Sequence, residues 1–184
     1  IQVATFGKGD AGKLTIRASQ IDIFDTEERK NGFSTGIFAG IIQDPFRSKE
    51  LPVGNGGQLN INTDRLSIIG GGRVEASNSG IGKAGDIFIT AKDLVEVVGS
   101  SSLIAANVAP QNSSNPITPE LISGDGGNVT INTSQLIVRD GAEISVSTFG
   151  QGDAGNLSIL ANNIKIDGGE NGVLTGFFAS VEEG

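Results

Sequence analysis

The sequence predicts an all-β fold: a right-handed parallel β-helix, a three-sided solenoid of about five coils. Two observations predict it. First, residues 1–18 (IQVATFGKGDAGKLTIRA) recur as residues 144–161 (ISVSTFGQGDAGNLSILA), with 12 of 18 positions identical. Second, each repeat unit contains three short segments in which aliphatic and polar residues alternate, the period of a strand with one buried face. Residues 1–184 are therefore expected to form a single β-helix segment of a longer repeat protein.

Glycine-rich turns mark where each coil begins. They lie near residues 7–12, 54–57, 82–85, 124–127 and 152–155, and the last glycines of these turns are separated by 45, 28, 42 and 28 residues. Long and short coils therefore alternate. Glycine suits such turns because it adopts positive φ and allows close backbone approach at little steric cost.

The alternating segments predict which side chains face the interior. A lone short unit cannot bury such a face, but parallel pairing with the equivalent strands of the next unit builds continuous internal columns. The repetition of one three-segment pattern favours the β-helix over a β-sandwich, the other fold that such short strands can form. The predicted inward pairs are Leu14/Ile16, Ile21/Ile23, Ile37/Ala39, Leu59/Ile61, Leu66/Ile68, Val74/Ala76, Ile87/Ile89, Val95/Val97, Leu103/Ala105, Val129/Ile131, Leu136/Val138, Ile144/Val146, Leu157/Ile159, Ile164/Ile166 and Phe177/Ala179.

Three insertions interrupt the coils, at residues 25–35, 40–53 and 106–123. The last two contain all five prolines, which cannot donate to a strand ladder, and both follow the third strand of a long coil. On that strand Phe38, Ile104 and Phe178 are expected to face outward as an interaction surface, which either the insertions or a partner would cover. Phe178 is expected to be the most exposed aromatic side chain, because the chain ends before a following insertion.

The composition excludes several function classes. The chain has no Cys and no His, which rules out disulfides, Cys/His zinc or haem sites and triads that depend on His or Cys. Thirteen Lys and Arg against 21 Asp and Glu give a net charge of −8, which disfavours nucleic acid as a partner. No apolar run approaches the ~18 residues of a membrane span.

The polar residues at the turns and on the strands bear on two kinds of site, a calcium site and a catalytic pair of carboxylates. The turn column reads Asp10, Asn55, Lys83, Asp125, Asp153, in which Asp125 and Asp153 are the candidate metal ligands on adjacent coils. Lys83 beside Asp125 favours a solvated turn over a calcium site, which needs successive acidic turns. Neither the second nor the third strand carries adjacent carboxylates, so we expect no catalytic residue, no cofactor and no enzyme activity.

The motifs TFGxGDAGxLxI and INTxxLxVRDGAxIS, the latter at residues 131–145, resemble the repeats of filamentous-haemagglutinin-like exoproteins, as in large cyanobacterial surface proteins. The resemblance spans essentially the whole chain. It implies two-partner secretion through an outer-membrane β-barrel transporter, which would be a partner of the parent chain. It also implies a location outside the cell, either secreted or on the outer cell surface.

These observations favour a structural role: a shaft or stalk segment of a secreted or cell-surface adhesin or extracellular filament. The alternative is a glycan- or matrix-binding module that uses the insertions at 40–53 and 106–123. A carbohydrate-active β-helix enzyme is a third reading, but the acidic cluster that it needs is missing from the sequence pattern. Unpaired parallel edges at both ends further predict end-to-end self-association.

Overall fold

The computed structural model describes all residues except 26–34, 43–50, 110–121, 170–172 and 183–184. In the described part, the regular secondary structure is entirely β strand. The strands are β1 (Gln2–Thr5), β2 (Lys13–Arg17), β3 (Gln20–Phe24), β4 (Gly36–Ile41), β5 (Gln58–Ile69), β6 (Arg73–Glu75), β7 (Ile87–Val98), β8 (Leu103–Ala105), β9 (Val129–Arg139), β10 (Glu143–Ser145), β11 (Thr148–Phe149), β12 (Leu157–Asp167), β13 (Gly176–Phe178) and β14 (Val181–Glu182).

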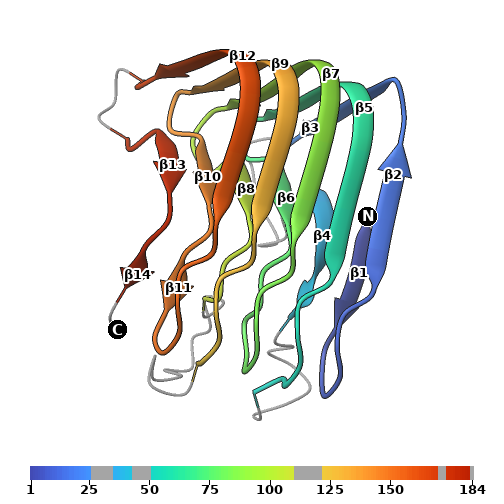
Figure 1. Ribbon diagram of the computed structural model, residues 1–184, viewed down its shortest axis with the longest axis vertical. Helices are drawn as coiled ribbons and strands as arrows, with labels where there is room; N and C mark the ends of the chain where they lie inside the picture. The colour runs from blue at the N-terminus through green and yellow to red at the C-terminus, as the bar shows by residue number, and fades with distance from the viewer. Residues whose placement is uncertain (26–34, 43–50, 110–121, 170–172, 183–184) are drawn as a thin grey trace.

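The strands form parallel sheets that run along the stack of repeats (Figure 1). In the long-strand sheet the order is β12-β9-β7-β5, and β2 and β3 both pair with β5. In the short-strand sheet the order is β1-β4-β6-β8-β10-β13, and β11 pairs separately with β14. Each strand therefore pairs with its equivalent in the neighbouring repeat, an architecture compatible with a β-helix or another solenoid.

Continuous columns of aliphatic side chains fill the interior, as the alternation predicts. The register of the long-strand sheet aligns Ile16, Ile61, Ile89, Ile131 and Ile159. The three central members are buried, whereas the two outer ones, which have a neighbouring strand on one side only, are half-buried. Stacking therefore creates this core, and each coil depends on its neighbours for burial.

β7 contains one extra residue relative to its neighbours, at the corner between its first two segments. The register shifts between Ala91 and Leu94, so that Lys92 and Asp93 stand where a neighbouring strand has one residue. Such a β-bulge absorbs an insertion without reversing the faces beyond it. Val95 and Val97 accordingly face the interior as predicted, and both are fully buried.

The predicted orientation of β8 is wrong by one residue. Ile104 aligns with Val74 and Ile144 and is fully buried, so it belongs to an inner column and not to an outward surface. The preceding turn, Gly99–Ser102, has four residues between the paired strand positions, where Gly70–Gly72 has three. This extra residue shifts every later side chain of the strand to the opposite face.

The described ends of the two long insertions also belong to the stack. β4 extends to Ile41, and isolated parallel bridges join Ile41 to Asn78 and Asn78 to Val108. Val108 and Ile122, at the two described ends of the second insertion, pack with Ala84 in a small separate core. Most of the insertion at 25–35 and the middle parts of the other two lie outside the described residues.

Candidate functional site

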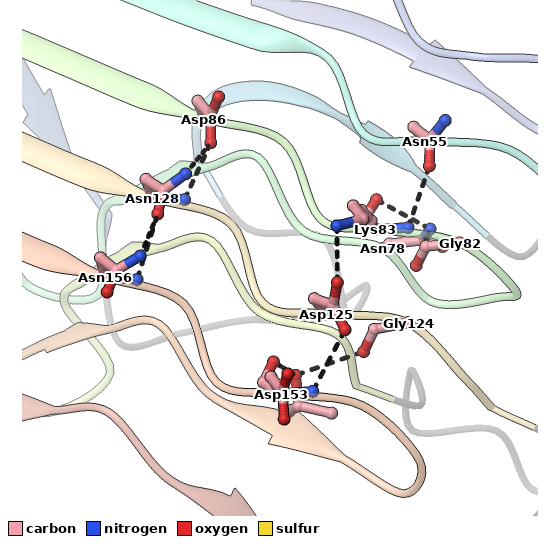
Figure 2. Close-up of polar contacts among 11 residues, drawn as sticks. Asn55, Asn78, Gly82, Lys83, Asp86, Gly124, Asp125, Asn128, Asp153 and Asn156 are labelled. Carbon is pink, nitrogen blue, oxygen red and sulfur yellow. Dashed lines mark hydrogen bonds and ion pairs between the residues drawn. The ribbon is translucent and has the colours of Figure 1, made fainter.

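The most regular polar feature is a hydrogen-bonded ladder along the glycine turns, defined by Asp10, Asn55, Lys83, Asp125 and Asp153. The backbone N–H of Asn55 donates to Oδ1 of Asp10 (2.7 Å) and that of Lys83 to Oδ1 of Asn55 (3.1 Å). The N–H of Asp153 donates in the same way to Oδ1 of Asp125 (3.2 Å; Figure 2). Each short polar side chain thus binds the backbone of the following coil, and Lys83, which has no acceptor, interrupts the series.

Lys83 instead forms an ion pair with the next coil. Its Nζ lies 2.6 Å from Oδ2 of Asp125, and this hydrogen bond is the main cause that lowers the pKa of the Asp125 carboxyl and raises the pKa of Lys83. Both carboxylate oxygens of Asp125 are therefore engaged, Oδ1 by Asp153 N–H and Oδ2 by Lys83. Among the described residues there is no group of three or more acidic side chains arranged to hold a metal ion. The contacts of the candidate ligands Asp125 and Asp153 are those of a turn ladder.

A second ladder runs parallel to the first, and the sequence analysis missed it. Oδ1 of Asp86 accepts from the backbone N–H and the side-chain amide of Asn128, both at 2.9 Å. Oδ1 of Asn128 accepts in the same way from Asn156, at 3.2 and 3.0 Å (Figure 2). Each of these residues directly follows the last glycine of its turn, which is the signal that could have revealed the ladder.

An open groove of about 400 Å³ lies among the turns and touches both ladders. Its lining includes Asn55, Lys83, Asp86 and Asn128, together with paired glycines from successive coils. A Cβ atom at Gly85 or Gly127 would overlap the carbonyl oxygen of the equivalent glycine one coil earlier. These glycines are therefore required by close packing between coils, which explains their column without a ligand.

Two buried polar side chains fasten the turns from inside. Nδ2 of the fully buried Asn78 donates to the carbonyl oxygens of Gly54 (2.9 Å), Gly82 (2.8 Å) and Lys83 (3.1 Å). The hydroxyl of Thr148 donates to the carbonyl oxygen of Asp153 at 2.9 Å. The carbonyl oxygens of Lys83 and Asp153 also accept backbone N–H groups of the neighbouring coil, from Gly56 and Gly126 (both 2.8 Å). The side-chain bonds thus add to the backbone bonds that hold the turns in place.

The outer face of the short-strand sheet differs from the predicted interaction surface. Phe38 and Phe178 face outward and are half-buried, and Ala105 takes the place predicted for Ile104. Among the described residues Phe178 is not the most exposed aromatic: Phe24 is 57 % exposed. The prediction considered only the last coil, but the first coil also lacks a neighbouring strand on one side.

That face also carries an ion pair between Arg73 and Glu75. Nη1 of Arg73 lies 2.9 Å from Oε1 of Glu75, whose side chain is 16 % exposed. Burial raises the pKa of the Glu75 carboxyl, and the charge of Arg73 opposes the shift. Burial also raises the pKa of Glu143, with Arg73 again opposing it and Glu182 adding to it. Glu75 and Glu143 lie on alternate coils, separated by β8, so they are not a directly neighbouring pair.

Comparisons of the chain with protein-family models, curated proteins and solved structures gave no match. Within the described residues no helix is long and apolar enough to cross a membrane. The repeated contacts of the stack are therefore the feature of the molecule from which a function is proposed.

Proposed function

We propose that the chain is a structural shaft segment of a secreted or cell-surface adhesin or extracellular filament. The observation that carries this proposal is the repetition of the same contacts from coil to coil. The inner column from Ile61 to Ile131 and the ladder from Asp86 to Asn156 run along the stack, and not around one localised site. Such an arrangement transmits stiffness along its length, as a rod requires.

The proposal includes a right-handed coil with three sides. Parallel strands joined by a crossover within one sheet are right-handed in nearly all proteins, which supports the hand. Each complete coil has three strand segments, for example the two halves of β9 followed by β10, which supports three sides.

A shaft should tolerate the removal of whole coils, and the chain offers a register-preserving deletion. Gly57 and Gly127 are equivalent positions 70 residues apart, so deletion of residues 57–126 from the full-length protein joins a long coil directly to a short one. We expect the shortened protein to fold and still be displayed. Deletion of residues 57–91, which removes only part of a coil pair, is the matched control and should abolish folding.

The location outside the cell, and export through an outer-membrane β-barrel transporter, rest on the resemblance of the TFGxGDAG repeats to secreted exoproteins. Antibodies raised against this segment should label intact cells of the organism that makes it, and external protease should remove the label. Labelling that appears only after lysis would contradict the proposed location. Binding of the purified segment to one glycan on an array would instead favour the binding-module alternative.

A further inference from the structure

Asn55 and Gly56 form the only Asn–Gly pair in the described part of the chain. In such a pair the backbone nitrogen of the glycine can attack Cγ of the asparagine side chain, because glycine has no side chain that hinders the approach. The new N–C bond closes a succinimide ring, and the side-chain nitrogen leaves as ammonia with the proton that the backbone nitrogen loses. Water then opens the ring and gives either aspartate or isoaspartate, in which the backbone runs through the former side chain.

The stacked coils hold both reacting groups of this pair. Oδ1 of Asn55 accepts the backbone N–H of Lys83 at 3.1 Å (Figure 2), and the N–H of Gly56 donates to the carbonyl oxygen of Lys83 at 2.8 Å. On the opposite side, Nδ2 of Asn55 donates to Oδ1 of Asp10 at 3.2 Å. The attacking nitrogen and the side chain that it would attack are therefore both bonded to neighbouring coils, and moving them together breaks these hydrogen bonds.

Burial does not protect the pair, because Asn55 is exposed and solvent can reach it. The same double contact recurs at the equivalent turn 70 residues later. There Oδ1 of Asp125 accepts the N–H of Asp153, and the N–H of Gly126 donates to the carbonyl oxygen of Asp153 at 2.8 Å. The double contact is thus a feature of the stack, and at Asn55 it holds a chemically labile pair.

We propose that Asn55 is a latent deamidation site, which the stacked turn protects and which becomes reactive when the coil of Lys83 separates from it. Aspartate, the normal product, fits this turn, since Asp125 occupies the equivalent place and accepts the same hydrogen bond. Isoaspartate lengthens the backbone by a methylene carbon, and the next residue has no room for the shift: a Cβ atom at Gly56 would lie 2.3 Å from the backbone nitrogen of Gly85. Isoaspartate at position 55 therefore prevents the turn from stacking again.

In a structural shaft, such a site would convert a transient opening of the coils into a permanent defect. The inference itself concerns the chemistry of one turn and does not depend on the proposed shaft or on its location. Protection of Asn55 could be absent in a true shaft, and it could be present in a chain that forms none.

The rate of deamidation in the folded chain and in the chain unfolded by guanidinium chloride, both at mildly alkaline pH, tests the proposal. Mass spectrometry of the tryptic peptide that ends at Arg65 follows Asn55 together with Asn60 and Asn62. The last two precede bulkier β-branched residues, so they are internal controls that should react slowly in both states. Asn55 should react at least about tenfold more slowly in the folded chain, because opening the turn breaks several hydrogen bonds. Equal rates at Asn55 in the two states, or equal conversion of Asn55 and Asn60 in the unfolded chain, would overturn the proposal.

Two variants test the contacts that protect the site. Asp10→Ala removes the acceptor of the Asn55 amide and should speed deamidation at Asn55 in the folded chain. Asp153→Ala is the matched control, because it changes the same residue type in the same column without touching Asn55. Equal rates in the two variants would refute the assigned contacts.

Refolding tests the consequence of the modification. Chains that carry isoaspartate at position 55 after incubation in denaturant should not regain the urea midpoint of the parent chain. Asn55→Asp, which has the normal product in place, should refold. Full recovery of the isoaspartyl chains would overturn the claim that this product prevents stacking.

Discussion

Replacing Ile131 with Asp tests whether the inner columns hold the coils together. Ile131 is fully buried between Ile89 and Ile159 on the adjacent strands. Loss of a buried Ile side chain costs about 2–5 kcal/mol, and a carboxylate without a partner at that site adds a further penalty. Because a domain is typically stable by only about 5–15 kcal/mol, Ile131→Asp should unfold at much lower urea than the parent chain at neutral pH.

Urea denaturation followed by far-UV circular dichroism measures this effect. Thr130→Asp is the matched control, because Thr130 is the neighbouring residue on the outer face and should tolerate the charge. Ile131→Asn separates lost packing from buried charge. Ile131→Asp should approach Ile131→Asn in mildly acidic solution, where the new carboxyl becomes protonated. Equal urea midpoints for Ile131→Asp and Thr130→Asp would refute the proposed inner and outer faces.

Three further outcomes follow from individual contacts. Gly127→Ala should strongly lower the thermal midpoint of unfolding, because the new Cβ would overlap the backbone of Gly85. Gly7→Ala is the control in another glycine turn: its Cβ would meet open space, so the thermal midpoint should be nearly unchanged. Asn78→Asp should lower the urea midpoint more than Asn78→Ala at neutral pH, because a carboxylate would face three carbonyl oxygens, and the difference should shrink on acidification. Because burial raises the pKa of Glu75, the contribution of this carboxyl to stability is present below pH 4.5 and is lost as the pH rises through the folded-state pKa. Glu75→Gln should therefore flatten the pH dependence of the urea midpoint. Identical pH profiles for the variant and the parent chain would contradict the assigned burial.

The inner columns were predictable from the sequence where one face alone carries aliphatic residues. In β5 the inward residues Leu59, Ile61, Leu66 and Ile68 are separated by polar residues, and the repeat supplies the same inward residues at Val129, Ile131, Leu136 and Val138, with Ile137 as an outward aliphatic residue. The exposure that results from a coil's position in the stack could not be predicted in this way. Ile164 and Ile166 follow the same pattern as their buried equivalents but are 46 % and 48 % exposed, because exposure depends on the presence of a next coil and not on local alternation.

The orientation of β8 could not be derived from period-two alternation. The run from Leu103 to Ala106 is apolar on both faces, so either register satisfies the pattern. The predicted inward pair Leu103/Ala105 requires a preceding turn of three residues, as at Gly70–Gly72, but the turn Gly99–Ser102 has four. Ser102 shows what the extra residue does: its buried hydroxyl donates to Val98 O (2.6 Å) and accepts from Gly71 N–H (2.9 Å). Ser102 thus bonds both to the end of β7 and to the shorter neighbouring turn, Gly70–Gly72.

The alternation of long and short coils is reflected in the residue that precedes each turn. Where the chain enters the turn directly, the side chain in this column donates to the carbonyl oxygen five residues later: Thr5 to Asp10, Asn78 to Lys83 and Thr148 to Asp153. Where an insertion intervenes, the equivalent residues are Ile41 and Val108, both fully buried. In these two coils the insertion lies between this residue and the turn. An aliphatic side chain at the position is buried without needing a hydrogen-bond partner, whereas a buried polar group without a partner costs about 1–3 kcal/mol. Once the structure has aligned the coils, the residue type in this column therefore distinguishes short coils from long ones. In the unaligned sequence the same residues do not reveal this difference.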